Sequence, residues 1–151
     1  MMQYSIIQGV QGICPTGWHI PMDEEWKVLE GAVDSKYGIG NSEWNKDDDY
    51  RGFDVGLNLK STSGWYNNGN GTDLFGFSGL PSGFRKKNEE GLFYLRIGEN
   101  VFWCSSTQDT LYGNDYKYNA WDRSLSWNDQ KIGHYRLAKE QGFSVRCIKD
   151  E

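Results

Sequence analysis

Apolar side chains recur at helical spacing in one stretch of the chain, residues 21–33. Trp26, Leu29 and Val33 fall at positions i, i+3 and i+7, so they would share one face of a helix. Pro21 opens this stretch, and acidic residues crowd its first turn, where the helix dipole and unpaired N–H groups favour them. The helix start therefore explains the acidic cluster better than acid/base or metal chemistry does: Asp23, Glu24 and Glu25.

The second half of the chain carries strand patterns instead. In residues 121–127, large side chains alternate with small polar ones, which predicts a strand with one exposed face. Asn128 and Asp129 favour a turn immediately after it. The β-prone segments are, in chain order, residues 92–97, 101–107, 121–127, 130–136 and 143–148, the last with Phe143, Val145 and Cys147 on one face.

Two polar regions separate the predicted helix from the strands. Residues 34–53 read as a surface excursion with a short second helix and a solvated acidic run at Asp47-Asp48-Asp49. Residues 61–85 are dense in Asn and Gly, which predicts ordered irregular structure. One helix or two, a small twisted antiparallel sheet and long ordered loops indicate an α+β fold, with residues 1–151 forming a single domain.

Charge and hydropathy exclude several classes of partner. The net charge is −5 and no long run of Lys or Arg stands out, which argues against nucleic acid and anionic membranes. No stretch approaches the ~20 apolar residues that cross a bilayer, so we expect no membrane insertion. The first residues do not resemble a signal peptide, so an export signal would lie outside this chain, for example in a longer parent protein from which this module comes.

Three cysteines bear on the compartment. If Cys14 and Cys147 pair, almost the whole chain becomes one closed loop with adjacent ends, and an oxidising compartment is implied. Such a loop stabilises the fold by about 4 to 5 kcal/mol in the chain-entropy model. The third thiol, Cys104, follows the aromatic residues Phe102 and Trp103 and has no base or cation near it in the sequence, which favours a buried small hydrophobe over a reactive nucleophile.

Two groups of polar residues are candidate binding sites. Alternating oxygen ligands in the Asn/Gly-rich region suggest a calcium loop, although the bidentate acid of an EF-hand is missing: Asn68, Asn70, Thr72 and Asp73. The segment 112–136 combines aromatic anchors with amides in the manner of adaptable binding surfaces: Asn114, Tyr116, Tyr118, Trp121, Arg123, Trp127, Asn128, Asp129 and Tyr135. The alternative is that Trp121 and Trp127 face the core while the Asn and Asp residues only form turns.

Ordered blocks of sequence carry a family resemblance. They are Cys14-Pro15-Thr16-Gly17-Trp18-His19-Ile20-Pro21, Leu59-Lys60-Ser61-Thr62-Ser63-Gly64-Trp65, Asn68-Gly69-Asn70-Gly71-Thr72-Asp73, Leu80-Pro81-Ser82-Gly83, Phe102-Trp103-Cys104-Ser105-Ser106-Thr107 and Gly142-Phe143-Ser144-Val145-Arg146-Cys147. Over about residues 12–149 the chain resembles the Fibrobacter succinogenes major paralogous domain. The resemblance implies secreted or surface proteins of Bacteroidetes and Fibrobacteres, and a fold like that of C-type lectins and formylglycine-generating enzymes. It implies no general activity.

The chain departs from the family pattern in three places. Met22 stands where Ser or Thr is usual, so the hydroxyl N-cap is lost and Asp23 is expected to replace it. Cys104 takes a position often held by tryptophan, and the aromatic strand that often precedes the Cys-Pro block is short or missing. Within this pattern the resemblance implies that Cys14 and Cys147 tie the entry segment to the final strand.

These observations predict a non-catalytic binding or display module on the surface of a gut-type Bacteroidetes bacterium. We expect it outside the cell, on the outer membrane or in the periplasm, with an extracellular glycan or protein as ligand and no cofactor unless calcium binds. Trp127-Asn128-Asp129 spells a motif of sugar-binding C-type lectins, but the Glu-Pro-Asn partner motif is absent. A structural or adhesive module is the alternative. A formylglycine-generating oxidase would need a reactive cysteine pair, and the two histidines, His19 and His134, lie far apart in sequence.

Overall fold

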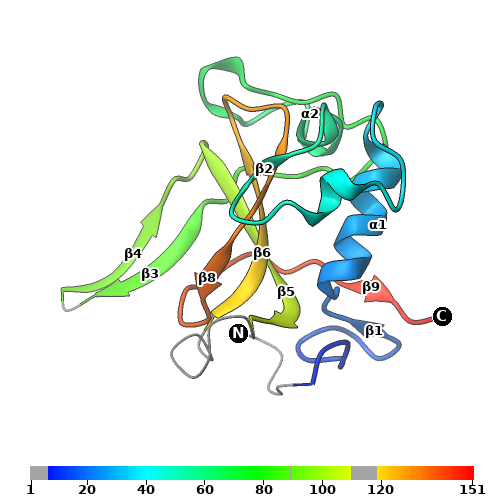
Figure 1. Ribbon diagram of the computed structural model, residues 1–151. Coiled ribbons are helices and arrows are strands. Elements are labelled where there is room, and N and C mark those ends of the chain that lie inside the picture. The colour runs from blue at the N-terminus through cyan, green and yellow to red at the C-terminus, as the bar shows by residue number, and fades with distance from the viewer. Residues whose placement is uncertain (1–6, 89, 110–118) are drawn as a thin grey trace.

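A computed structural model describes residues 7–88, 90–109 and 119–151 (Figure 1). Its main parts are a helix, α1 (Asp23–Val33), and a mainly antiparallel sheet that lies beside it. The sheet order is β2-β7-β6-β5, and β8 pairs with a further part of β6. The α+β class expected from the sequence is confirmed. The five strands of the sheet are β2 (Asp49–Arg51), β5 (Asn100–Gln108), β6 (Asn119–Ser126), β7 (Ile132–His134) and β8 (Arg136–Ala138).

Helix α1 packs its predicted apolar stripe into the core. Trp26 and Val33 are buried, Leu29 packs beside them, and the Trp26 ring lies 5.9 Å from the ring of Trp103 in β5. The residue before the helix, Met22, gives no side-chain cap of the usual kind. The expectation that Asp23 replaces the lost hydroxyl cap is wrong, because its carboxylate binds buried partners from other elements instead. Glu25 supports the helix start by accepting the Met22 N–H at 2.7 Å.

Strand β6 is buried on both faces, so the prediction of a half-exposed strand is wrong. Residues 120–126 are all buried, including the small polar ones. The polar face is covered because Tyr50 of β2 hydrogen-bonds to Ser124 and Ser126, and the N–H of Tyr135 donates to Asp122 at 3.1 Å. The alternation of residue types along β6 therefore separates an apolar and ionic face from a hydrogen-bonded one.

The predicted strand at 92–97 is present as β4 (Gly91–Leu95), but its partner was not predicted. It pairs antiparallel with β3 (Phe84–Asn88), with Lys86 opposite Phe93. This hairpin projects away from the rest of the molecule, on the side opposite α1 (Figure 1). It is anchored at its base, where the Phe84 ring lies 5.2 Å from the ring of Phe102.

The two ends of the described chain lie side by side. The short strand β1 (Trp18–His19) pairs antiparallel with β9 (Ile148–Lys149), and Cys14 forms a disulfide with Cys147. The long last strand predicted over 143–148 is wrong, because residues 143–147 form only a single bridge, through Ser144, and β9 begins at Ile148. The disulfide indicates an extracellular or periplasmic environment. In the described parts of the chain, no helix has the length and apolar character to cross a bilayer.

The region between α1 and the hairpin is irregular but closely hydrogen-bonded, as predicted. It holds two short 3-10 helices, η1 (Ser42–Asn45) and η2 (Tyr66–Asn68), and the helix α2 (Val55–Leu59). The single carboxylate of Asp34 accepts hydrogen bonds from backbone N–H groups of more than one turn, including that of Phe53 at 2.7 Å. The acidic run is partly exposed, with Asp48 ion-paired to Arg136.

Candidate functional site

A cleft of about 250 Å³ lies at the end of β6, where the turn that follows the strand meets η2 and α2. Helix α2 and the end of β6 lie at the top of Figure 1. We call it the Trp127 cleft. It unites part of both predicted groups: Asn68 and Asn70 from the calcium candidates, and the three consecutive residues that follow Ser126. The full lining is Leu57, Lys60, Asn68, Gly69, Asn70, Trp127, Asn128, Asp129 and Gln130.

Backbone contacts hold the two sides of the cleft together. Gly69 lies so close to the carbonyl of Trp127 that a Cβ there would collide with it. Trp127 of the cleft and its neighbour Tyr66, two residues before Asn68, are both attached to the turn before β5. Tyr66 N–H donates to Gly98 O at 2.7 Å, and Trp127 N–H donates to Glu99 O at 2.9 Å. The backbone positions of both aromatic residues are therefore fixed by main-chain bonds that do not depend on their side chains.

Trp127, which lines the cleft, forms an aromatic pair with Tyr66, which lies just outside the lining. Their ring centroids are 5.3 Å apart and nearly perpendicular, an arrangement that the ring quadrupoles favour. Trp127 is partly buried against the core, whereas Tyr66 is 60% exposed. Tyr66 was not among the residues expected at a site. Its position directly after the family block ending in Trp65 is the sequence signal that could have identified it.

Polar groups surround this aromatic pair, and several keep unused hydrogen-bonding capacity. Asn128 uses its Oδ1 to accept from Ser126 Oγ at 2.7 Å, and Asp129 uses its Oδ1 to accept from Lys131 N–H at 2.9 Å. The second polar atom of each side chain has no hydrogen-bond partner among the described residues. The cleft thus offers an amide donor and a carboxylate acceptor next to the aromatic rings.

Lys60 forms the floor of the cleft and fixes its shape. Its side chain is buried, and its Nζ donates to the carbonyls of Ser126 and Asp129 at 3.0 and 2.9 Å. Burial lowers the pKa of the Lys60 ammonium from its ordinary value. Because Nζ donates its hydrogen bonds to two carbonyls that flank the turn, Lys60 positions Asn128 and Asp129 rather than binding a ligand itself.

The four calcium candidates do not converge on one point. Asn70 donates to Asn68 Oδ1 at 3.1 Å, so these two lie together. Thr72 instead hydrogen-bonds to Asn58 Oδ1 at 3.2 Å, and Asp73 accepts from Ser78 through both carboxylate oxygens. Within residues 7–88, 90–109 and 119–151, no group of three or more His, Cys, Asp or Glu side chains is placed to hold a metal ion.

The structure separates the nine predicted ligand-binding residues into distinct groups. Asn114, Tyr116 and Tyr118 lie outside the described residues. Trp127, Asn128 and Asp129 line the cleft. Tyr135 packs instead against Tyr50, with ring centroids 6.0 Å apart, and the remaining two are buried: Trp121 and Arg123.

Arg123 is the clearest correction to the predicted site. Its guanidinium is completely buried and ion-paired with Glu30 and Asp23 of α1, the latter at 2.7 Å. Glu30 also binds the buried Arg51 at 2.8 Å, so a network of charges joins α1 to the sheet. Trp121 lies at the edge of this network, stacked 4.2 Å from the ring of His134. Neither Trp121 nor Arg123 belongs to an exposed ligand surface.

The same network determines the protonation of its members. Burial opposes ionisation of Asp23, but the hydrogen bond from His134 and the charge of Arg123 hold its pKa below the ordinary value. Burial and the two neighbouring guanidinium groups lower the pKa of His134, so it is neutral at pH 7. An Asp–His pair is a common catalytic arrangement, but here His134 is 1% exposed and cannot meet a substrate.

The remaining thiol and histidine have structural environments. Burial raises the pKa of Cys104 to about 11, so the thiolate required for nucleophilic chemistry is scarce at neutral pH. This fits the small-hydrophobe interpretation. His19 lies between Glu25 at 3.0 Å and Asp150 at 2.6 Å, and so links α1 to the C-terminal segment.

A second, larger hollow of about 360 Å³ lies between α1, the loop at residues 75–77 and residues 146–148, which include the disulfide-bonded Cys147. Most of its lining is apolar, including Leu29 and Phe75, and Arg146 lies over the Phe77 ring at 4.3 Å. The sequence did not predict this groove, because its walls come from segments more than 100 residues apart. It lacks the cluster of amide groups that distinguishes the Trp127 cleft.

Comparison with known proteins identifies the family. The model of the Fibrobacter succinogenes major domain matches residues 2–149, slightly more of the chain than its motifs indicate. No curated protein and no solved structure gives a significant match. Because the family model covers nearly the whole chain, this protein belongs to the Fibrobacter succinogenes major domain family.

Proposed function

We propose that this chain is a non-catalytic binding module that recognises carbohydrate at the Trp127 cleft. The observation that carries the proposal is the aromatic pair of Tyr66 and Trp127, fixed beside amide and carboxylate groups with unused hydrogen-bonding capacity. A sugar ring presents an apolar face and a rim of hydroxyls. The first packs on an aromatic ring, and the second pairs with amide and carboxylate groups.

The rigidity of the cleft supports this proposal. A preformed site loses little conformational entropy when a ligand binds. Here the main-chain bonds of Tyr66 and Trp127 and the two bonds from Lys60 Nζ fix the site before any ligand arrives. The ligand meets ordered groups rather than ordering them.

The disulfide that joins the two ends supports two parts of the proposal: a C-type-lectin-like fold, and a role in presenting the cleft on the bacterial surface. A domain whose first and last strands pair and are joined by a disulfide presents its irregular middle region at a distance from both ends, as C-type-lectin-like domains do. We propose this fold for the chain and a location on the bacterial surface, in agreement with the disulfide. Asn128 and Asp129 are then the residues of the Trp-Asn-Asp motif that reach the ligand.

The oxidase alternative receives little support from the thiols. A formylglycine-generating reaction needs a pair of reactive cysteines, but Cys14 and Cys147 are bonded to each other and the pKa of Cys104 is raised. A structural or adhesive module remains the main alternative, and binding measurements separate it from the proposal.

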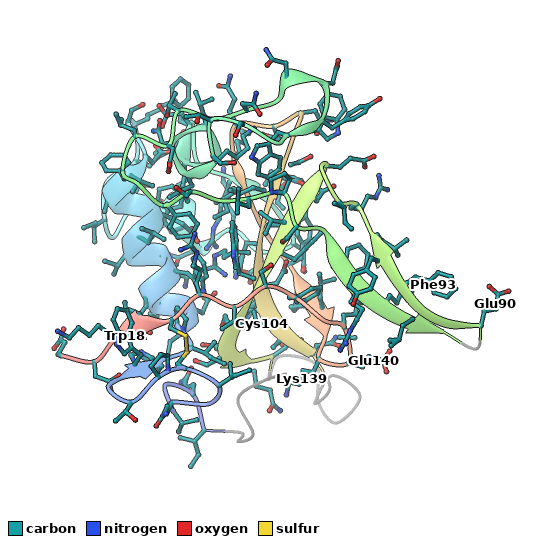
Figure 2. All side chains as sticks on the ribbon, turned by 180° about the vertical axis from the view of Figure 1, so that it is seen from behind. Trp18, Glu90, Phe93, Cys104, Lys139 and Glu140 are labelled. Carbon is teal, nitrogen blue, oxygen red and sulfur yellow. A yellow bond between two sulfur atoms is a disulfide. The ribbon has the colours of Figure 1, made fainter. Side chains whose placement is uncertain are left out.

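A glycan array probed with and without calcium tests the proposal, followed by calorimetric titration of the saccharides that bind. We expect Trp127→Ala to abolish binding and Tyr66→Ala to weaken it. Phe75→Ala, in the apolar groove, and Trp18→Ala, an exposed tryptophan at the opposite end of the molecule (Figure 2), are matched controls that keep full affinity. Binding that survives Trp127→Ala but not Phe75→Ala would move the site to the groove. No bound glycan on the array would favour a protein ligand or a structural role.

A further inference from the structure

One charged group at the Trp127 cleft is open to a ligand, the carboxylate of Asp129. Of the described residues that line the cleft, Lys60 and Asp129 have charged side chains. Asp129 is partly exposed, and its Oδ1 accepts the Lys131 N–H at 2.9 Å. Its Oδ2 has no hydrogen-bond partner among the described residues. This oxygen carries negative charge and can only accept hydrogen bonds.

The ammonium of Lys60 is not available to an anionic ligand. Only 2% of this residue is exposed, and its Nζ donates to the carbonyls of Ser126 and Asp129. The ammonium also lies 5.4 Å from the centroid of the buried Trp65 ring, whose face attracts a cation. A carboxylate or sulfate that entered the cleft would therefore meet the charge of Asp129, without a cationic hydrogen-bond donor among the described lining residues to compensate for it.

The other polar side chains of the lining are uncharged amides. Asn128 uses its Oδ1 to accept from Ser126 Oγ, which leaves its NH2 group as a donor. A sugar hydroxyl can donate to Asp129 Oδ2 and can also accept from such an amide, because it has both capacities. A carboxylate or sulfate only accepts hydrogen bonds, so it can pair with the amide but not with Asp129. The cleft therefore matches the hydroxyls of a neutral sugar better than an anionic substituent.

We propose that Asp129 makes the Trp127 cleft selective for saccharides without an anionic group, so that uronic acids, sialic acids and sulfated sugars are rejected. The inference rests on the proposed carbohydrate function of the cleft and adds the charge class of the ligand to it. Asp129 acts in two ways. A hydrogen bond to an ionised acceptor is stronger than one to a neutral acceptor, and like charges placed in contact disfavour the wrong ligand.

The net charge of the chain acts in the same direction and must be separated from the effect of Asp129. The formal charge of −5 repels any anion at long range, and salt screens this repulsion beyond about 8 Å at physiological ionic strength. Contact with Asp129 acts at short range and depends on the residue at that position. Removing one negative charge elsewhere therefore separates the two causes. Glu140 is suitable for this, because its side chain is exposed and lies low in Figure 2, whereas α2 lies at the top of the molecule in Figure 1.

Calorimetric titration of matched ligands tests the selectivity. For a neutral saccharide that binds on the array, the ligands are the corresponding uronic acid and the methyl ester of that acid, which has nearly the same size without the charge. The wild-type chain should bind the ester at least about tenfold more tightly than the acid, and Asp129→Asn should bring this ratio close to one. Asparagine keeps an oxygen that can accept the Lys131 N–H, so the turn is retained. An acid bound by the wild type as tightly as its ester would overturn the proposal.

The glycan array gives a second measurement that does not require the ester to fit the cleft. Asp129→Asn should bind acidic glycans that the wild type rejects, whereas the control Glu140→Gln should bind the same glycans as the wild type. An unchanged set of glycans for Asp129→Asn, or an equal gain in Glu140→Gln, would overturn the proposal. If no saccharide binds the wild-type chain, the proposed function fails together with this inference. If neutral and acidic saccharides bind alike, carbohydrate recognition stands and only the selectivity fails.

Discussion

The interior of β6 and the turn that follows it contain the same kinds of residue in opposite environments. Inside the strand, Trp121, Asp122 and Arg123 are buried against α1, β7 and β8. Immediately after it, Trp127, Asn128 and Asp129 line an open cleft. Residue type does not distinguish them. The difference is the presence of Glu30 and Asp23 on the facing helix, which pair with the charge of Arg123 and permit its burial.

This contrast has a physical basis in the cost of burying charge. A guanidinium can be removed from water only when partners compensate for its lost hydration. Glu30 compensates for two at once, Arg51 and Arg123, and is itself unexposed. The turn after β6 has no such carboxylate facing it from α1, so its polar groups stay at the surface. Four variants test whether the buried, paired residues inside β6 stabilise the fold while the residues of the turn after it bind the ligand.

The largest effect is expected from Glu30→Ala. Removing the carboxylate leaves the buried guanidinium groups of Arg51 and Arg123 without their shared ion-pair partner. The free energy of unfolding should fall by about 3 to 5 kcal/mol. Glu24→Ala is the matched control on the same helix. Its carboxylate is exposed and pairs with Lys27, so its loss should cost no more than about 1 kcal/mol. Denaturant unfolding measures both, and similar costs for the two variants would remove the basis of the comparison.

A smaller effect is expected at the boundary between the two regions. Gly69→Ala places a Cβ against the carbonyl of Trp127, which must shift, and should lower the free energy of unfolding by about 1 to 3 kcal/mol. Gly38→Ala is the control, since a Cβ there meets no atom within 4 Å. Thermal unfolding measures the cost. If Gly69→Ala is as stable as Gly38→Ala, the cleft is less tightly closed than the main-chain contacts indicate.

The sequence predicts some elements well because their signals are local. Helix α1 follows from apolar spacing and an acidic first turn, and the turn at Asn128 follows from residue types that favour turns. Strand β3 was missed because Arg85, Lys86 and Lys87 show no alternation, and its pairing with β4 depends on a partner that only the folded chain provides.

The site was predictable only in part, for the same reason. The motif at 127–129 marks one wall of the cleft, and the Asn/Gly-rich segment marks the other, but nothing in the sequence indicates that they meet. Their meeting depends on Gly69 lying against Trp127 O and on Lys60 reaching two carbonyls across the fold. The burial of Arg123 is equally non-local, since Glu30 is 93 residues away in the sequence.

The pH dependence of the free energy of unfolding provides a test within the buried interior of β6. Burial raises the pKa of Asp122 to about 8, so the folded chain keeps this proton between pH 4 and 8 while the unfolded chain loses it. The free energy of unfolding of the wild type should therefore fall, relative to Asp122→Asn, as pH rises through this range, by at most about 1.4 kcal/mol per pH unit. Denaturant melts of both proteins at pH 5, 6, 7 and 8 measure the difference. A constant difference would mean that Asp122 is ionised in the folded state.

The smallest effect on stability is expected at Gln130. Its substitution is useful because it should change saccharide binding while leaving the fold intact. Its side chain is exposed at the cleft and has no hydrogen-bond partner among the described residues, while its carbonyl accepts the Leu57 N–H at 3.0 Å. Gln130→Ala keeps that main-chain bond, so the free energy of unfolding should change by no more than about 0.5 kcal/mol. Titration with a saccharide that binds should nevertheless show weaker binding, because an amide of the cleft is lost. Unchanged affinity would confine recognition to Tyr66, Trp127, Asn128 and Asp129. A large loss of stability would instead show that the turn is part of the scaffold, and the distinction between the interior of β6 and its end would no longer hold.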